Sequence, residues 1–360
     1  MHKSFGPNIN NYTKLHLFSH GLDQIKFLDE LLDQVIILDK SKNICCANKS
    51  AHKRFGSRLE GKSISSVLRD AKLLDSIEVS INQKKTQIVD VEIKKPNFQF
   101  YKASIIPGPS KLCNQEQSVI IFLKDLTEVF KTQKFKSDFV ANVSHELRTP
   151  LQSIKLGLET INQGHATNDF ESQKKFLPIL LQQTSRMETL VSDLLSLSKI
   201  ELEEHIRPTD KLDIKEIISH VVEIHKQIIK KNDISVDIKG EESKYIMLGH
   251  RDRLIEVFTN LIDNAIKYSP KGKKIYISLV NNNESTTVSI RDEGIGIPKK
   301  YIPRITERFF RVDPAKSKEV GGTGLGLAIV KHIVNQHRAE IDIKSEEGKG
   351  TEFILTFPNS

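Results

Sequence analysis

Ser144–Leu151, with the sequence SHELRTPL, places a histidine where it could act as a nucleophile. Apolar residues recur every three or four positions around this segment, which predicts an amphipathic helix with one buried face. His145 lies between two positions of that stripe and so points to solvent, with Glu146 beside it and Thr149 one turn later. Pro150 removes one helical hydrogen bond just beyond the histidine. The stripe consists of Val140, Val143, Leu147, Leu151, Ile154, Leu158 and Ile161.

Side chains that could contact a nucleotide lie in a helix predicted from Asp252 onward. Asn260 and Asn264 are four residues apart and share a face of this helix. Carboxamide oxygens can bind Mg²⁺ together with phosphate oxygens and water. Lys267 and Tyr268, one turn later, offer a cation for phosphate and a ring that can pack beside a base.

Two glycine-rich segments follow. In RDEGIGIP, after a predicted strand at residues 286–290, Asp292 can accept a hydrogen bond from an exocyclic amine, and Gly294 and Gly296 allow close approach of a ligand. In GGTGLGLAIV, residues 321–330, glycines lead into an apolar helix whose free amides favour phosphate. The candidate contacts in that second segment are Gly322, Thr323, Gly324, Leu325 and Gly326.

A fourth cluster, ERFFRVD, lies between the two glycine segments. Arg308 and Arg311 could reach phosphates, and Phe309 and Phe310 could anchor a mobile segment. Taken alone, the asparagine pair is most often a surface or capping feature, Asp292 with its two glycines is most often a turn, and a glycine-rich loop is a weak signal. Together, in this order, they predict a binding site for a nucleotide.

The chain is predicted to be an α+β protein with several domains. Five strand-like runs in its first third, with helices between the second and third, predict a small antiparallel α+β module. The strands are expected at Val35–Asp39, Asn43–Ala47, Ile88–Ile93, Phe98–Ile106 and Ser118–Leu123. The domains are expected as an N-terminal lead at 1–22, this module at 23–127, a helical hairpin at 128–207 and an α/β domain at 208–360.

The helical hairpin is predicted to need a second copy of itself. Its first helix runs from about Glu128 to Asn162, and a turn over Asn162–Asp169 leads into a second amphipathic helix. One hairpin cannot cover both apolar stripes, whereas two hairpins form a four-helix bundle, so we expect a homodimer. The stripe of the second helix is Leu180, Met187, Val191, Leu194 and Leu197.

Composition narrows the class of protein. The chain has 360 residues, of which 38% are hydrophobic and 28% are charged, and no apolar run is long enough to span a bilayer. Its three cysteines form neither a disulfide framework nor a metal-ligand spacing. The net charge of +8 comes from scattered lysines without a groove-reading motif, which argues against nucleic acid. We expect a cytoplasmic protein, membrane-associated only through an anchor outside this sequence.

The four clusters and SHELRTPL together resemble a bacterial two-component sensor histidine kinase, similar to the phosphate-regulon type. The resemblance implies a phosphoacceptor and dimerisation hairpin of the HisKA type and a sandwich-like ATP-binding domain of the Bergerat, or GHKL, type. It also implies ATP and Mg²⁺ as cofactors and a response regulator as partner. Residues 31–56 resemble the start of a PAS sensor domain, with no residue that specifies haem or flavin, which favours a spacer or an unidentified ligand.

The resemblance assigns roles to individual residues. His145 matches the phosphoaccepting histidine, Glu146 its acidic neighbour and Thr149 the residue linked to dephosphorylation of the partner. Asn264 matches the direct Mg²⁺ ligand, and Asp292 matches the contact to the adenine amino group. The other matched nucleotide contacts are Asn260, Lys267, Tyr268, Gly294, Gly296, Arg311, Gly322, Thr323, Gly324, Leu325 and Gly326, with Phe309 and Phe310 in the F box.

The departures from the family pattern are small. Glu293 stands where many relatives have asparagine, Thr306 replaces an aromatic residue, and the lid from Arg311 to Gly321 is short and charged. In the expected reaction neutral His145 attacks the γ-phosphorus, and Glu146 accepts the other imidazole N–H. Two alternatives stay open at this point: a GHKL-type ATPase without phosphohistidine, and a non-catalytic scaffold gated by ATP.

Overall fold

The computed structural model describes residues 27–94, 97–109, 117–166, 170–241, 244–282, 284–313 and 322–359. These fall into two compact units, Met1–Asp138 and Phe139–Ser360. The boundary lies inside a helix, eleven residues after the expected end of the first module at residue 127. The expected N-terminal lead, part of the hairpin turn, Cys113 and most of the lid lie outside the described residues.

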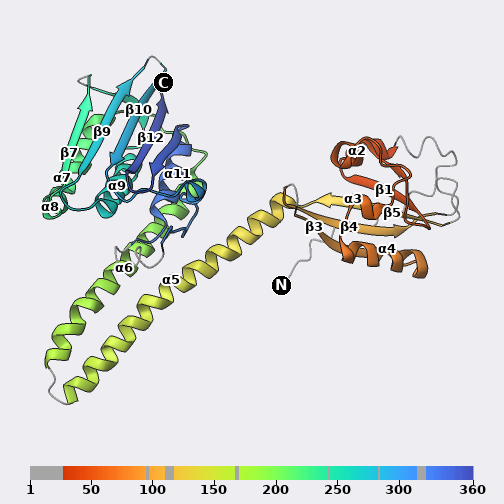
Figure 1. The fold of residues 1–360 in the computed structure, drawn as a ribbon, viewed down its shortest axis with the longest axis horizontal. Coiled ribbons are helices and arrows are strands. Elements are labelled where there is room, and N and C mark those ends of the chain that lie inside the picture. The colour runs from red at the N-terminus through yellow and green to blue at the C-terminus, as the bar shows by residue number, and fades with distance from the viewer. Residues whose placement is uncertain are drawn as a thin grey trace. The chain divides into compact units, whose positions relative to one another are not determined.

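The first unit is built on a five-stranded antiparallel sheet with the order β2-β1-β5-β4-β3. All five predicted strands are present, so the expected antiparallel α+β module is confirmed (Figure 1). The strands are β1 (Gln34–Asp39), β2 (Ile44–Ala47), β3 (Gln87–Ile93), β4 (Gln99–Pro107) and β5 (Ser118–Asp125). The helices are α2 (Lys49–Phe55), α3 (Ile64–Val67) and α4 (Ala71–Gln83).

Asn48 joins the first strands of this unit to the helix that follows them. Its side chain is buried, and Oδ1 accepts hydrogen bonds from the backbone N–H of Val35 and of Ala51, each at 3.0 Å. Its Nδ2 donates to the carbonyls of Leu28 and Asp33 at 2.9 Å. One asparagine therefore caps α2 and fixes the start of β1, which satisfies polar groups that would otherwise be buried without partners.

Two long helices follow as an antiparallel hairpin, α5 (Thr127–Ala166) and α6 (Phe170–Glu203) (Figure 1). α5 continues through Pro150 without interruption. The helices approach closely at Gly157, where an added Cβ would lie 2.7 Å from the side chain of Leu180. Val191 of the predicted α6 stripe is 44% exposed in the single chain, whereas its neighbour Leu190, which is not part of that stripe, is buried. Leu190 turns toward the following domain, which sequence spacing within the helix does not reveal.

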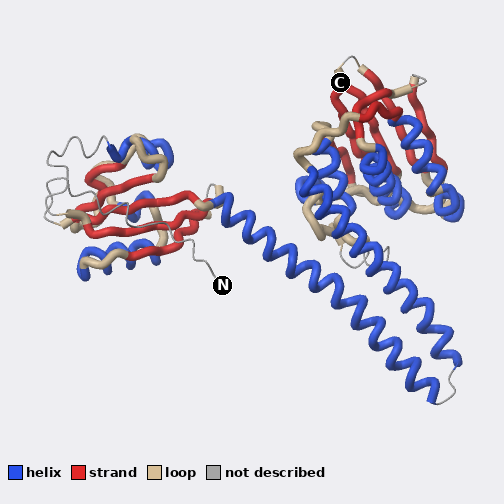
Figure 2. Tube along the Cα trace, turned by 180° about the vertical axis from the view of Figure 1, so that it is seen from behind, coloured by secondary structure: helices blue, strands red, loops and turns tan. Residues whose placement is uncertain are grey.

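The last 150 residues form a mixed sheet with the order β11-β12-β10-β9-β7, in which only the pair β7 and β9 is parallel. Helices lie against one face of this sheet, as expected of an α/β sandwich (Figure 2). The strands are β7 (Ser235–Gly240), β9 (Lys274–Asn281), β10 (Ser285–Asp292), β11 (Glu340–Glu346) and β12 (Gly350–Pro358), with a ribbon of β6 (Asp210–Asp213) and β8 (Ile246–Gly249). The helices are α7 (Ile214–Ile224), α8 (Lys226–Lys231), α9 (Arg251–Tyr268), the short 3₁₀ helix η4 (Lys299–Arg304) and α11 (Gly326–Gln336).

The hairpin and the sandwich share one hydrophobic core. Leu190, Leu197 and Ile200 of α6 are buried together with residues of α7, α9 and α11. Burial of such side chains contributes roughly 1.5–3 kcal/mol each, which holds the end of α6 against the sandwich. No helix within the described part of the chain combines the length and the apolar character that a membrane span requires.

Candidate nucleotide site and phosphoacceptor histidine

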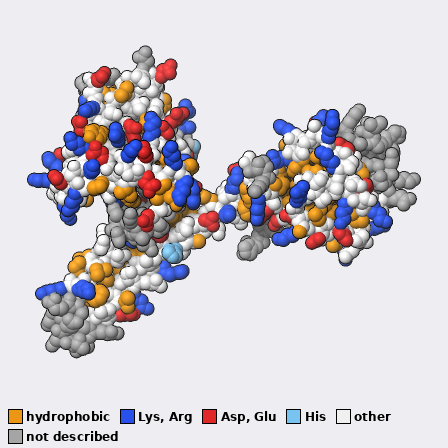
Figure 3. Space-filling view, in the orientation of Figure 1, with side chains coloured by type: hydrophobic (Ala, Val, Ile, Leu, Met, Phe, Trp, Pro, Cys, Tyr) orange, Lys and Arg blue, Asp and Glu red, His pale blue; other side chains and the backbone are white. Residues whose placement is uncertain are grey.

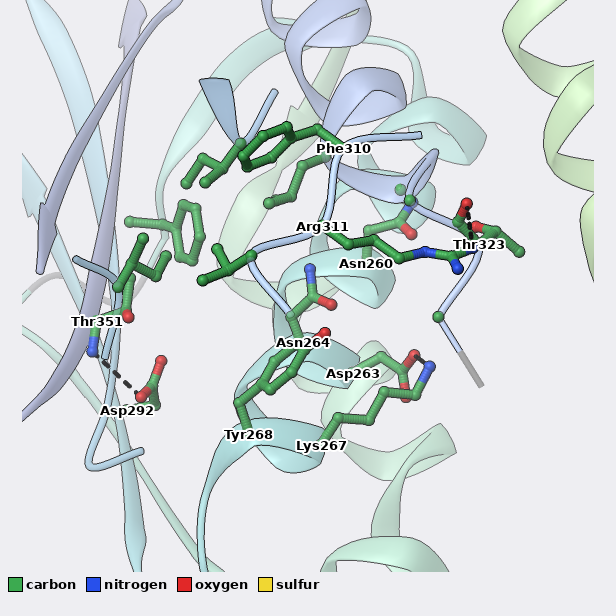
Figure 4. Close-up of a pocket in the computed structure, with 18 of the residues that line it drawn as sticks. Asn260, Asp263, Asn264, Lys267, Tyr268, Asp292, Phe310, Arg311, Thr323 and Thr351 are labelled. Carbon is green, nitrogen blue, oxygen red and sulfur yellow. Dashed lines mark hydrogen bonds and ion pairs between the residues drawn. The ribbon is translucent and has the colours of Figure 1, made fainter. Parts of the chain in front are cut away.

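A cavity of about 550 Å³ opens between α9, the loops that follow β10 and precede α11, the strand β12 and the helix α6 (Figure 4). It collects residues from six separate segments of the sequence. The predicted residues that line it are Asn260, Asn264, Lys267, Tyr268, Asp292, Gly296, Arg311, Gly322, Thr323, Gly324 and Gly326, together with Phe310 of the F box.

Seven predicted residues do not line this cavity, among them Phe309 and Arg308, whose guanidinium pairs with Glu201 of α6. Gly294 and Leu325 support its wall: an added Cβ on Gly294 would lie 2.6 Å from the carbonyl of Tyr268, and Leu325 is fully buried. The other three, His145, Glu146 and Thr149, lie on α5.

Asp292, at the end of β10, marks one end of the cavity. Its Oδ1 accepts hydrogen bonds from the backbone N–H of Gly294 at 2.8 Å and of Thr351 at 3.1 Å (Figure 4). Burial raises the pKa of the Asp292 carboxyl, and these two hydrogen bonds oppose the rise. With Oδ1 engaged, Oδ2 is the oxygen left to accept a hydrogen bond from a ligand, as an adenine amino group would provide.

The glycine that precedes Thr351 explains how the backbone reaches Asp292. Gly350 has a φ of +110°, and a Cβ there would lie 2.0 Å from the carbonyl oxygen of Asp292. Only glycine allows β12 to come this close to the end of β10. Thr351 was not among the predicted residues, although the GKGT segment at the start of β12 is a local signal for a close backbone approach.

The asparagine face of α9 lies at the middle of the cavity. Asn264 extends into the cavity between Asp292 and Arg311 (Figure 4), and among the described residues its amide has no hydrogen-bond partner. Asn260 donates instead to the carbonyl of Glu256 at 3.0 Å, which leaves its Oδ1 available. Lys267 pairs with Asp263 at 2.6 Å.

This donor set fits a nucleotide with a magnesium ion. The described residues contain no group of three or more His, Cys, Asp or Glu side chains that could hold a metal by itself. A divalent cation would therefore rely on the amide oxygen of Asn264 and on phosphate oxygens, the mixed ligand set that Mg²⁺ accepts. Lys267 and Arg311 are cationic side chains that line the cavity, and in this structure Asp263 and Glu146 pair with them.

The second glycine segment brings the loop before α11 against the F box. Gly324 has a φ of +75°, and its carbonyl accepts a hydrogen bond from Phe309 N–H at 2.8 Å. An added Cβ on Gly326, the first residue of α11, would lie 2.5 Å from Oδ1 of Asn260. The ring of Phe310 packs near Tyr301, with centroids 5.8 Å apart. These contacts set the loop beside the N-terminus of α11, where backbone amides favour anions.

His145 is exposed on α5, as its position between stripe residues predicts. Thr149 donates to the carbonyl of His145 at 3.3 Å, one turn back along the helix. The expected hydrogen bond from the imidazole to Glu146 is absent among the described residues. Glu146 Oε2 instead accepts from Arg186 of α6 at 3.3 Å and from Arg311 at 2.9 Å, because two guanidinium groups compete for the carboxylate.

Residues of the hairpin complete the cavity wall, which the sequence did not predict. Asp193 of α6 lines the cavity, and its Oδ2 accepts a hydrogen bond from Thr323 Oγ at 2.7 Å. Desolvation raises the pKa of Asp193, and the carboxylates of Glu256 and Asp263 act in the same direction. Nothing local to Asp193 marks it as a site residue, because 130 positions separate it from Thr323.

Comparisons with known proteins identify two regions of the chain. Residues 135–203 match the His Kinase A (phospho-acceptor) domain family. Residues 249–360 match the family of histidine kinase-, DNA gyrase B- and HSP90-like ATPases. The first region contains His145, and the second contains every predicted residue of the nucleotide cavity.

Several characterised proteins are similar to the chain. Sensor histidine kinase WalK of Bacillus subtilis is 37% identical over 67% of this chain and 39% of its own length. Sensor protein SrrB of Staphylococcus aureus is 30% identical over 99% of this chain and 62% of its own length. The chain thus spans less than two thirds of either relative.

Among solved structures, the fold resembles that of histidine kinase ThkA in its complex with response regulator protein TrrA. The TM-score is 0.50 at 23% identity, over 95% of this chain and 99% of that one. By its two matched regions and its relatives, the chain belongs to the sensor histidine kinases.

Proposed function

We propose that this chain is an ATP-dependent histidine kinase that phosphorylates His145 and passes the phosphoryl group to an aspartate of a response regulator. The observation that carries the proposal is the single cavity that gathers Asn264, Asp292, Arg311 and the glycine loop in the same unit as an exposed histidine. The chain's own residues supply an acceptor for a base, cations for phosphates and a free amide for a cation.

The proposed site binds ATP along the cavity from Asp292 to Thr323. Oδ2 of Asp292 accepts a hydrogen bond from the adenine amino group, and Tyr268 packs beside the base. Lys267, Arg311 and the amides at the start of α11 contact the phosphates. When bound, Mg²⁺ near Asn264 offsets negative charge on the phosphates.

In the proposed reaction, a ring nitrogen of neutral His145 attacks the γ-phosphorus. A nitrogen–phosphorus bond forms while the bond from the γ-phosphorus to the bridging oxygen breaks, and ADP leaves with that electron pair. The imidazole becomes cationic until its second nitrogen loses a proton. Since His145 does not line the cavity here, transfer requires the hairpin and the sandwich to shift relative to one another.

Release of Glu146 is part of the same proposal. The carboxylate can accept the imidazole N–H only when Arg311 no longer holds it, and phosphate oxygens are competing acceptors for that guanidinium. Thr149 lies one turn from the histidine, and its proposed role is in dephosphorylating the regulator, so that the chain also acts as a phosphatase. Thr149→Ala is expected to lower regulator dephosphorylation and leave labelling of His145 intact.

We also propose that the hairpin forms a homodimer. Large apolar side chains lie at its surface (Figure 3), and they recur at heptad-like spacing on both helices. The exposed set on α5 and α6 includes Leu151, Leu158, Leu177, Leu181, Val191 and Leu195. A second hairpin would cover them in a four-helix bundle.

The test uses the full chain with γ-labelled ATP and Mg²⁺. Label that is stable to base and labile to acid is expected on the wild type and absent from His145→Gln. His220→Gln is the matched control, because His220 is also an exposed helical histidine but lies outside both the hairpin and the cavity. Equal labelling of wild type and His145→Gln would contradict the assignment. Steady release of phosphate without covalent label would indicate an ATPase of the gyrase and heat-shock group instead.

A further inference from the structure

Asp193 places a carboxylate of the hairpin inside the nucleotide cavity. It lies on α6, outside the region that matches the ATPase family, yet it lines the same cavity as Asn264 and Arg311. Its Oδ2 holds the hydroxyl of Thr323 at 2.7 Å, at the far end of the cavity from Asp292 (Figure 4). The proposed roles of the nucleotide residues leave this carboxylate unexplained.

A second carboxylate of the hairpin accepts a hydrogen bond from Arg311, the donor next to Thr323. Glu146 of α5 accepts from Arg311, whose side chain is 7% exposed, at 2.9 Å. The same guanidinium donates to the backbone carbonyl of Thr323 at 3.0 Å, so the two contacts form one connected set. Two carboxylates of the hairpin thus take the hydroxyl and the guanidinium that would serve a distal phosphate.

We propose that Asp193 is a specificity residue of the nucleotide site that selects against a γ-phosphate while the hairpin is docked. The proposal rests on the proposed function, in which the base lies at Asp292 and the phosphates extend toward Thr323. A diphosphate has no γ-phosphate to approach Asp193. A triphosphate brings additional negative charge to the end of the cavity that this carboxylate occupies, where like charges repel strongly because water is partly excluded.

The docked arrangement therefore holds ADP better, relative to ATP, than the sandwich would without Asp193. A triphosphate must displace the carboxylate from Thr323 and compete with Glu146 for Arg311, whereas a diphosphate does neither. Binding energy of the γ-phosphate is then used to separate the hairpin from the cavity, which is also what frees Glu146 beside His145.

The experiment measures binding of ADP and of the non-hydrolysable ATP analogue AMPPNP, each with Mg²⁺, to the full chain by calorimetry. Asp193→Asn keeps an oxygen to accept from Thr323 and removes the charge. The affinity for AMPPNP is expected to rise about three- to ten-fold, while the affinity for ADP changes less than about two-fold.

Glu204→Gln is the matched control. Glu204 is also a carboxylate of the hairpin that contacts the sandwich, since its Oε2 lies 3.4 Å from Nδ1 of His332, but it does not line the cavity. This variant should bind both nucleotides as the wild type does. Glu146→Gln gives a second, independent reading: it should also raise the affinity for AMPPNP more than that for ADP, because it releases Arg311.

The remaining outcomes each decide the question. Unchanged affinities in Asp193→Asn, an equal rise for both nucleotides, or a fall for AMPPNP would overturn the role of Asp193. If the wild type and all variants bind neither nucleotide, the proposed function itself fails, and this inference with it. The selective rise in AMPPNP affinity in Asp193→Asn, together with no phosphohistidine on the wild type, would support the role of Asp193 and refute the kinase proposal.

Discussion

Arg311 reaches from the loop beside the nucleotide cavity to Glu146, the residue next to the proposed phosphoacceptor, across 2.9 Å. Both side chains are largely removed from solvent, at 7% and 18% exposure, and Arg186 holds the same carboxylate oxygen. A ligand that takes Arg311 away from Glu146 would therefore change the hydrogen bonding of the residue next to His145.

Loss of this carboxylate should cost stability. Glu146→Gln leaves two poorly solvated guanidinium groups without a counter-charge, so the free energy of unfolding should fall by about 2 kcal/mol. Urea denaturation followed by circular dichroism measures the change. Glu159→Gln is the control, because its pair with Lys155 is solvent-exposed and should change stability by less than about 0.5 kcal/mol. Equal effects of the two substitutions would contradict the ion-pair interpretation.

Substitution of Asp292 should separate binding from stability. Asp292→Asn retains an oxygen for the N–H groups of Gly294 and Thr351 but presents the amide NH2, a donor, where the amino group of the base needs an acceptor. Adenine nucleotide affinity should fall by about ten-fold or more. Asp263→Asn, in the same cavity but paired with Lys267, should lower it less.

The pH dependence of Asp292→Asn follows from the same burial. Because the pKa of Asp292 is raised in the folded chain, its contribution to stability is fully present below the unfolded value of about 3.9 and is lost as pH rises through the folded value. Asparagine does not ionise. The melting temperature of the variant, relative to wild type, should therefore increase from about pH 4 to pH 7, and a difference that stays constant over this range would show that burial does not perturb this group.

Two glycines with similar backbone angles should differ in how much stability an alanine substitution costs. Gly296 and Gly348 have φ of +68° and +81°, but an added Cβ would lie 2.0 Å from the Glu346 carbonyl at Gly296 and in open space at Gly348. Gly348→Ala should lose about 1 kcal/mol from backbone strain alone. Gly296→Ala should lose at least about twice that and bind nucleotide more weakly. Thermal melting and calorimetry check both, and similar losses at the two positions would argue against the clash.

The apolar surface of the hairpin predicts its assembly. Leu158→Asp combined with Leu181→Asp should convert a dimer into a monomer, because each substitution places a charge in the proposed bundle. Light scattering coupled to size-exclusion chromatography measures the mass. Val280→Asp, at an exposed apolar position of β9, should leave the mass unchanged. A wild-type chain that runs as a monomer at all concentrations tested would refute the dimer.

The sequence predicted those parts of the site that a short segment can encode. Asn260 and Asn264 share a face because a helix turns every 3.6 residues. The glycines near Asp292 and at Gly324 mark positions where the backbone has a positive φ or lies too close to another segment for a Cβ. The five strands of the first unit were equally local, since alternation and turn residues define each of them.

The parts that the sequence missed depend on contacts between distant segments. Asp193 enters the cavity only because Leu190 and Leu197 bury that face of α6 in the sandwich core. Likewise, the partner of Glu146 could not be chosen from sequence, because Arg186 and Arg311 are 40 and 165 positions away. Glu293, a departure from the family pattern, accepts hydrogen bonds from Lys274 N and Tyr276 Oη, so it supports the sheet and not the ligand.

The contact between Asp193 and Thr323 has a thermodynamic corollary. If a γ-phosphate weakens docking of the hairpin through this contact, docking must weaken triphosphate binding by the same factor. An upstream stimulus that changes docking would then change the fraction of nucleotide cavities occupied by ATP, as well as the position of the hairpin. Under this proposal, the extent of His145 phosphorylation would vary with the ratio of ATP to ADP in the cell. A given stimulus would then produce less phosphorylation when that ratio is low.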